Sequence, residues 1–117
     1  MPNYLLEASY TPEAWARLVA NPQDRMDAVR APIEKLGGRI ISAFFAFSQS
    51  DTVSILEMPN NVNAAAIAIA FAAGGALKNV KTTPLMTAAE ALEAIKKAGT
   101  SGYKSLVTGA ASAAGQH

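Results

Sequence analysis

Cysteine is absent from this 117-residue chain, and its single histidine is the last residue, His117. The lack of cysteine excludes disulfides, thiol catalysis and cysteine-ligated zinc, and one terminal imidazole is a poor basis for a metal site. Charged residues are also few, at 16% of the chain, with ten Lys and Arg against nine Asp and Glu. Because nucleic-acid binding needs positive charge concentrated on one face, we expect no nucleic-acid partner. We also expect no metal and no other cofactor.

Long hydrophobic runs are missing as well. The longest uncharged apolar run, residues 64–77, has 14 residues and contains Gly74 and Gly75, whereas a helix that spans a bilayer needs about 20. The N-terminus lacks the basic stretch and apolar segment of a secretory signal. We therefore expect a cytoplasmic protein without a membrane partner.

Apolar residues nevertheless make up half of the chain, and 25 of them are alanine. This composition predicts one globular domain with a modest core, not a disordered chain. From Gly99 onward the sequence is rich in Gly, Ala and Ser. We expect a domain over residues 1–98 and a C-terminal tail over residues 99–117, held by its own domain or by a neighbouring subunit.

Alternating apolar and polar residues predict four strands, and apolar residues at spacings of three, four and seven predict helices. A helix starts after Thr11, a capping hydroxyl followed by proline. A second such signal, Asn21-Pro22, divides this helix into two pieces with a kink near residue 21. A capping box of Thr87 and Glu90 opens the last helix. The predicted strands cover residues 3–10, 39–48, 52–58 and 77–86, and the predicted helices cover residues 12–36, 61–73 and 87–97.

The order strand, helix, strand, strand, helix, strand predicts an α+β fold of the ferredoxin-like βαββαβ type. In this fold, two helices cover one face of a four-stranded antiparallel sheet. Here a C-terminal helix and the tail follow it. The first helical segment is expected to face the sheet with an apolar stripe made of Trp15, Leu18, Val19, Met26, Val29, Ile33 and Leu36.

The strand over residues 39–48 is apolar in both of its alternating sets, which is typical of a strand covered on both faces. Helices cover only one face in the predicted fold, so a second copy of the chain is expected to cover the other. We therefore predict a homodimer or a higher homo-oligomer, packed sheet to sheet as in a dimeric α+β barrel and burying about 800 Å² per subunit. One set contains Ile41, Ala43, Phe45 and Phe47, and the other Ile40, Phe44 and Ala46.

Several segments give the chain a resemblance to a known family over residues 1–97. They are Tyr10-Thr11, residues 21–25, Leu36-Gly37-Gly38-Arg39, residues 49–61 and residues 79–85. Together they resemble the GYD-domain proteins, whose Gly-Tyr-Asp signature corresponds here to Gln49-Ser50-Asp51. The resemblance implies a small bacterial ferredoxin-like domain without an established biochemical role, so it transfers a fold and not a mechanism.

Four polar residues are candidates for ligand contact. Asp51 matches the aspartate of the signature, and its carboxylate is also suited to fix the hairpin by accepting bonds from backbone N–H groups. Glu7 and Lys81 lie in neighbouring predicted strands, where they can form a salt bridge or an acid/base pair. Glu57 shares an alternation face with apolar residues, where burial raises the pKa of a carboxyl, although its place at the strand end favours the rim.

The large aromatic residues are expected to form the core, with a pocket between sheet and helices as the alternative. They are Tyr4, Tyr10, Trp15, Phe44, Phe45, Phe47 and Phe71.

Three functions remain open. The leading hypothesis is a homo-oligomeric protein that binds a small molecule or acts as an accessory protein, without catalytic activity. The second is a cofactor-free enzyme that uses the cleft between sheet and helices, with Glu7, Glu57 or Lys81 as acid or base; it requires a real cavity. The third is a structural assembly module in which the alanine-rich helix and the tail pack between subunits. No phosphate-binding loop, nucleophile elbow or Ser-His-Asp set points to an established catalytic class.

Overall fold

The computed structural model describes residues 1–107, and His117 with most of the expected tail lies outside the described residues. The chain divides into two compact units, Met1–Leu85 and a unit that begins at Met86. The first unit contains one antiparallel sheet with the strand order β2-β3-β1-β4. Its strands are β1 (Asn3–Tyr10), β2 (Arg39–Phe45), β3 (Thr52–Glu57) and β4 (Leu77–Leu85).

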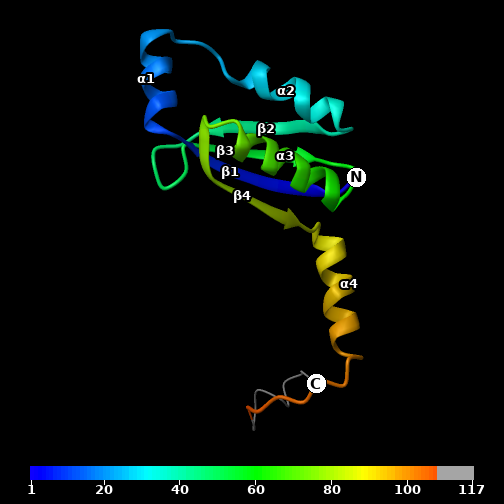
Figure 1. Ribbon diagram of the computed structural model, residues 1–117. Helices are drawn as coiled ribbons and strands as arrows, with labels where there is room; N and C mark the ends of the chain where they lie inside the picture. The colour runs from blue at the N-terminus through cyan, green and yellow to red at the C-terminus, as the bar shows by residue number, and fades with distance from the viewer. Residues whose placement is uncertain (108–117) are drawn as a thin grey trace. The chain divides into compact units, whose positions relative to one another are not determined.

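Helices α2 (Met26–Lys35) and α3 (Asn61–Ala73) lie over one face of this sheet (Figure 1). The element order, the strand order and the position of these two helices fit the predicted ferredoxin-like α+β fold. The opposite face of the sheet, here called the open face, carries no helix of the first unit.

The first helical segment differs from the prediction. Helix α1 (Pro12–Ala20) is capped by the Thr11 side chain, which accepts a hydrogen bond from the N–H of Ala14, as expected. The second helix does not begin at Asn21-Pro22 but at Met26, after a five-residue connection. The predicted apolar stripe faces the sheet only along α2, where Ile33 is buried and Leu36 packs against the core. Along α1 the prediction is wrong, because this helix has no buried residue and Val19 is 78% exposed.

The core lies between the sheet and helices α2 and α3. The sheet contributes Tyr4, Leu6 and Leu56, which the register of β1 and β3 places on the helix-covered face. The Tyr4 hydroxyl donates a hydrogen bond to the side-chain oxygen of Asn61 at the start of α3. This bond satisfies the polar atom of a buried ring and fixes α3 to the centre of the sheet. The other core residues are Ile33, Met58, Ala64 and Ile67.

A β-bulge in β2 reverses the predicted alternation. Ile40 pairs with Leu56, but Phe44 pairs with Val53, and the register shifts between Ile40 and Ser42. Leu56 and Val53 point to opposite faces of the sheet, and residues paired across two strands share a face. Ile40 and Phe44 therefore also lie on opposite faces, although simple alternation along β2 predicts one face for both. Ile40 packs against the core, whereas Phe44 lies on the open face and is 68% exposed.

The expectation that the aromatic residues form the core is therefore correct only in part. Tyr4 and Tyr10 are buried, and Phe71 packs against the core. The strand ends at Phe45 and not at Ser48, so Phe47 falls in the loop and is fully exposed. The remaining exposed aromatic residues of this group are Trp15, Phe44 and Phe45.

Two adjacent glycines make the turn from α2 into β2. Gly37 adopts a φ of +87°, a left-handed conformation that ends the helix. Gly38 is required for a different reason, because a Cβ atom there would lie 2.5 Å from the backbone oxygen of Glu57. The turn therefore brings β2 against the end of β3 with no room for a side chain.

The second unit contains helix α4 (Ala88–Ala98). It starts with the predicted capping box, in which the Thr87 hydroxyl accepts from the N–H of Glu90 and the Glu90 carboxylate accepts from the N–H of Thr87. Leu92 and Ile95 are exposed on this helix. Across the described residues, every helix is too short or too polar to cross a membrane.

Candidate functional site

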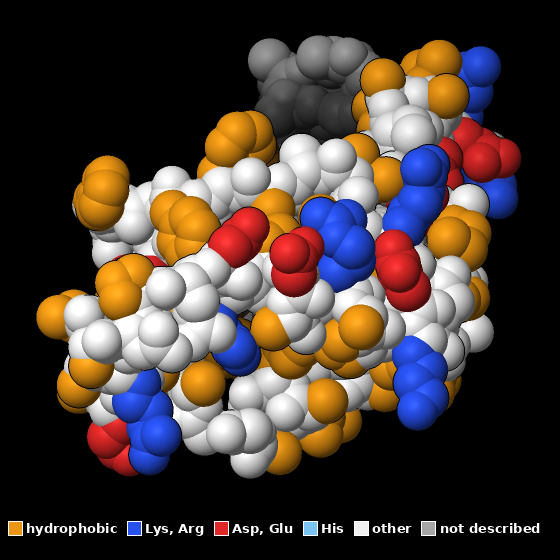
Figure 2. All heavy atoms as spheres, turned by 90° about the horizontal axis from the view of Figure 1, so that it is seen from above, with side chains coloured by type: hydrophobic (Ala, Val, Ile, Leu, Met, Phe, Trp, Pro, Cys, Tyr) orange, Lys and Arg blue, Asp and Glu red, His pale blue; other side chains and the backbone are white. Residues whose placement is uncertain are grey.

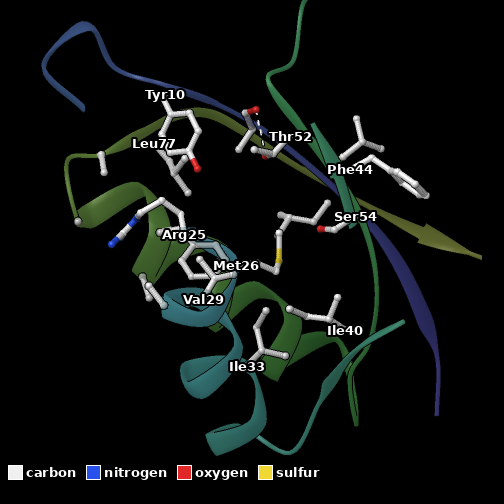
Figure 3. Close-up of a pocket in the computed structure, with 18 residues that line it drawn as sticks. Tyr10, Arg25, Met26, Val29, Ile33, Ile40, Phe44, Thr52, Ser54 and Leu77 are labelled. Carbon is white, nitrogen blue, oxygen red and sulfur yellow. Dashed lines mark hydrogen bonds between the residues drawn. The ribbon is translucent and has the colours of Figure 1, made fainter. Parts of the chain in front are cut away.

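A cavity of about 270 Å³ lies between the sheet and helices α2 and α3 (Figure 3). Its position follows from small side chains on the sheet and from the loose packing of α2, of which only Ile33 is buried. The cavity is close to the lower end of the size range of small-molecule sites. Its walls are mainly apolar and include Leu6, Met26, Val29, Ile33, Ile40 and Phe71.

Four polar side chains border this cavity: Tyr10, Arg25, Thr52 and Ser54. The Thr52 hydroxyl donates to the backbone oxygen of Ala8 at 3.2 Å and is thus committed to the sheet. The Tyr10 and Ser54 hydroxyls point into the cavity in Figure 3. Neither has a hydrogen-bond partner within the part of the chain that the structure describes, so both are free to bind a ligand.

Tyr10 is a neutral hydrogen-bond donor at physiological pH. Burial raises the pKa of its phenol, which is ordinarily about 10. The positive charge of Arg25 opposes this shift, and the negative charges of Asp51 and Asp24 add to it. The ring packs edge-on against Trp15, with 4.9 Å between centroids. The Tyr10 hydroxyl is therefore protonated and held in place by its neighbour.

Asp51 fixes the strand end that carries Tyr10. Its Oδ2 accepts a 2.9 Å hydrogen bond from the N–H of Tyr10, and its own N–H donates to the backbone oxygen of Ala8 at 2.9 Å. The backbone oxygen of Asp51 accepts from the N–H of Ala46. The Ser9 hydroxyl adds a bond to the same loop, donating to the backbone oxygen of Gln49 at 3.0 Å. The β2–β3 hairpin is thus fastened to the end of β1 through one aspartate.

The other three candidate residues lie on the open face. Glu7 pairs in register with Lys81, but no salt bridge joins their side chains in the part of the chain that the structure describes. Glu57 is at the rim, where its Oε1 accepts a 2.6 Å bond from Nε of Arg39. This hydrogen bond lowers the pKa of the Glu57 carboxyl and raises that of Arg39. Since the Arg39 side chain is largely exposed, the contribution of this pair to stability is small.

The structure does not bring the four candidates together at the cavity. Glu7, Glu57 and Lys81 are on the far side of the sheet, and Asp51 reaches the cavity only through Tyr10. The cavity residues with free polar groups are instead Tyr10, Arg25 and Ser54, which the sequence does not mark as a set. Strand alternation does place Ser54 and Leu56 on one face, but nothing in the sequence shows that this face contains a cavity.

A second hollow, an open groove of about 460 Å³, lies beside α1 and the β2–β3 hairpin. It is lined by Tyr10, Trp15, Arg25, Phe45 and Asp51, among others. It is larger than the cavity but more open to solvent, and Asp51 is already bonded to the backbone of Tyr10. The cavity between the sheet and helices α2 and α3 is more enclosed than this groove and is therefore the better candidate site.

The charge distribution argues against an extended ionic surface. Figure 2 shows acidic and basic side chains next to one another on the face that it presents. Within residues 1–107, no three His, Cys, Asp or Glu side chains lie close enough to hold a metal ion.

Comparison with known proteins gives the family of the chain. The sequence profile of the GYD domain matches residues 4–95, which is most of the chain. The chain belongs to the GYD-domain family. In this GYD domain, Asp51 is the residue whose carboxylate fastens the hairpin to the end of β1. No curated protein matches the chain.

Proposed function

We propose that this GYD domain is a homo-oligomeric protein that binds a small, mainly apolar molecule in the cavity between the sheet and helices α2 and α3. One observation carries the proposal: the cavity combines apolar walls with hydroxyl groups that have no partner among the described residues. Apolar walls with a few directed polar groups are typical of small-molecule sites.

The same cavity favours binding over catalysis. An enzyme of this type needs an acid or base at the cavity, and the candidates for that role, Glu7, Glu57 and Lys81, belong to the open face. The described residues that line the cavity include no Asp, Glu, His or Lys, and burial raises the pKa of the Tyr10 phenol, which stays protonated at neutral pH. The cavity is thus suited to bind a molecule, but within residues 1–107 its lining offers no carboxylate, imidazole or amine that could accept a proton from that molecule.

Titration of the full chain with Nile red, a neutral apolar dye, tests this binding function. Ala70 and Ala72 are both exposed on α3, but only Ala70 borders the cavity. We expect Ala70→Trp to weaken dye binding at least tenfold because the indole occupies the opening, and Ala72→Trp to bind as the original chain does. Equal dye binding by both variants, or no dye binding by the original chain, would overturn the proposal.

The open face supports the homo-oligomeric part of the proposal. The strand register places Leu5 of β1 and Val53 and Ile55 of β3 together on this face. Phe44 lies beside them on β2 and Leu85 on β4. A second copy is the fitting occupant, because Glu7 and Lys81, paired in register, leave this face without a charge excess of one sign. A sheet-to-sheet contact of about 800 Å² per subunit would be of ordinary size.

A second candidate function, that of an assembly module, is favoured by α3. The helix contains no charged residue, and it is apolar on its outer side as well as on the side that packs on the sheet. Val62 and Ile69 are 76% and 67% exposed on that outer side. A helix that is apolar all round is normally covered. If α3 joins subunits, Ile69→Glu lowers the mass measured by light scattering, and an unchanged mass rejects this role.

A further inference from the structure

We infer that the ligand is a small carboxylate with an apolar body, whose carboxylate is bound by the Arg25 guanidinium and the Tyr10 hydroxyl at one end of the cavity. This inference rests on the proposed function, because it names the chemistry of the molecule that the cavity takes.

Arg25 is the cationic residue at the cavity. It is half-buried, it lines both the cavity and the groove beside α1, and it has no carboxylate within ion-pair distance among residues 1–107. A charge partly removed from water is costly unless an opposite charge compensates it. The planar guanidinium is suited to a carboxylate, to which it can donate two parallel hydrogen bonds.

Tyr10 supplies a second hydrogen-bond donor at the cavity. Its hydroxyl lies at the same end of the cavity as Arg25, away from Ser54 (Figure 3). Of the three charges that act on this hydroxyl, that of Arg25 has a larger effect than that of either aspartate. A protonated phenol and a guanidinium from the same end of the cavity offer two kinds of donor to one anion.

The two nearby acids are committed elsewhere and do not line the cavity. Asp24 accepts a 2.9 Å hydrogen bond from the N–H of Met26, at the start of α2. Asp51 accepts from the N–H of Tyr10. Both carboxylates are thereby held at backbone amides, and Arg25 keeps its guanidinium available at the cavity edge.

The rest of the cavity defines the body of the ligand. Beyond the Arg25 end, its walls are formed by apolar side chains such as Val29, Ile33 and Ile40. A volume of about 270 Å³ restricts the ligand to a small molecule. The Ser54 hydroxyl at the far end can accept or donate one further hydrogen bond.

Competition against Nile red with octanoate and with octan-1-ol tests the inference, because these two probes differ chiefly in the carboxylate. Hydrogen bonds to charged groups are stronger than neutral ones, so octanoate is expected to bind roughly ten to a hundred times more tightly than octanol. Arg25→Gln should abolish this preference while dye binding persists, and Arg25→Lys should restore part of it. Tyr10→Phe should weaken octanoate about fivefold and leave octanol unchanged.

Arg30→Gln is the matched control, since it removes the same charge from an exposed position of α2 that does not line the cavity. It should keep the preference for octanoate. Equal binding of octanoate and octanol, or an unchanged preference in Arg25→Gln, would overturn the carboxylate inference and leave the binding function standing. Failure of Nile red to bind would overturn both.

Discussion

The carboxylate of Asp51 accepts a 2.9 Å hydrogen bond from the backbone N–H of Tyr10. The two residues are 41 positions apart in the chain, so this bond joins the β2–β3 hairpin to the end of β1. It thereby fixes the residue whose phenol points into the cavity (Figure 3). In this structure Asp51 is thus a positioning residue for the candidate site.

Replacing Asp51 is expected to destabilise the domain and to weaken ligand binding. Asp51→Ala leaves the N–H of Tyr10 without a partner, which costs ~1–3 kcal/mol of unfolding free energy. Asp51→Asn keeps an acceptor oxygen and should lose less. Urea denaturation measures both, with Glu34→Ala, an exposed acid at the end of α2, as the control. An Asp51→Ala variant as stable as this control would contradict the positioning role.

Gly38 is expected to tolerate no side chain. Gly38→Ala places a Cβ against the backbone oxygen of Glu57 and the sulfur of Met58, so β2 must shift away from β3. We expect a loss of ~1–3 kcal/mol by thermal or urea unfolding. Gly74 has an ordinary helical φ and room for a methyl group, so Gly74→Ala should be neutral or slightly stabilising. Equal stability of the two variants would show that the turn is not as tight as described.

The pH dependence of stability should reveal the buried phenol of Tyr10. Burial raises its folded pKa above the unfolded value of about 10, so the folded state holds its proton at a pH where the unfolded state has lost it. The resulting stability is complete below pH 10 and is lost as the pH rises through the folded pKa. Unfolding free energies measured between pH 8 and 11 should therefore fall more steeply for the original chain than for Tyr10→Phe. Parallel curves would contradict the assignment.

Phe44 is expected to be a main contact residue between copies, because its side chain is exposed on the open face. Phe44→Glu introduces a charge there, and we expect it to reduce the light-scattering mass to that of one subunit at micromolar concentration. Phe47 is also exposed but lies in the loop after β2, so Phe47→Glu should leave the mass unchanged. The opposite result, or a monomeric original chain, would reject the sheet-to-sheet contact.

Much of this fold can be predicted from local patterns. The Thr11 cap and the capping box at Thr87 act within one turn of chain, so the sequence shows them directly. The bulge in β2 depends on how that strand pairs with β3, which alternation within one strand does not reveal. Alternation alone therefore predicts that Ile40 and Phe44 share one face of the sheet, whereas the bulge places them on opposite faces.

The candidate site was harder to predict for a related physical reason. A sequence indicates which side chains can act as acids, bases or ion-pair partners, such as Glu7, Glu57 and Lys81. It does not indicate that the strand register places these three on the open face. Arg25 becomes a cavity residue only because α2 begins at Met26 and packs loosely over the sheet. Such a position depends on tertiary packing and leaves no local signal.

The most direct test of the account locates the ligand on the protein. In ¹H–¹⁵N correlation spectra of the labelled full chain titrated with octanoate, the amide signals of Met26, Val29 and Ser54, which border the cavity, should move most. Those of Ile55 and Thr83, on the open face, should move little. Shifts concentrated on the open face, with the cavity signals unmoved, would contradict a binding site between the sheet and its helices.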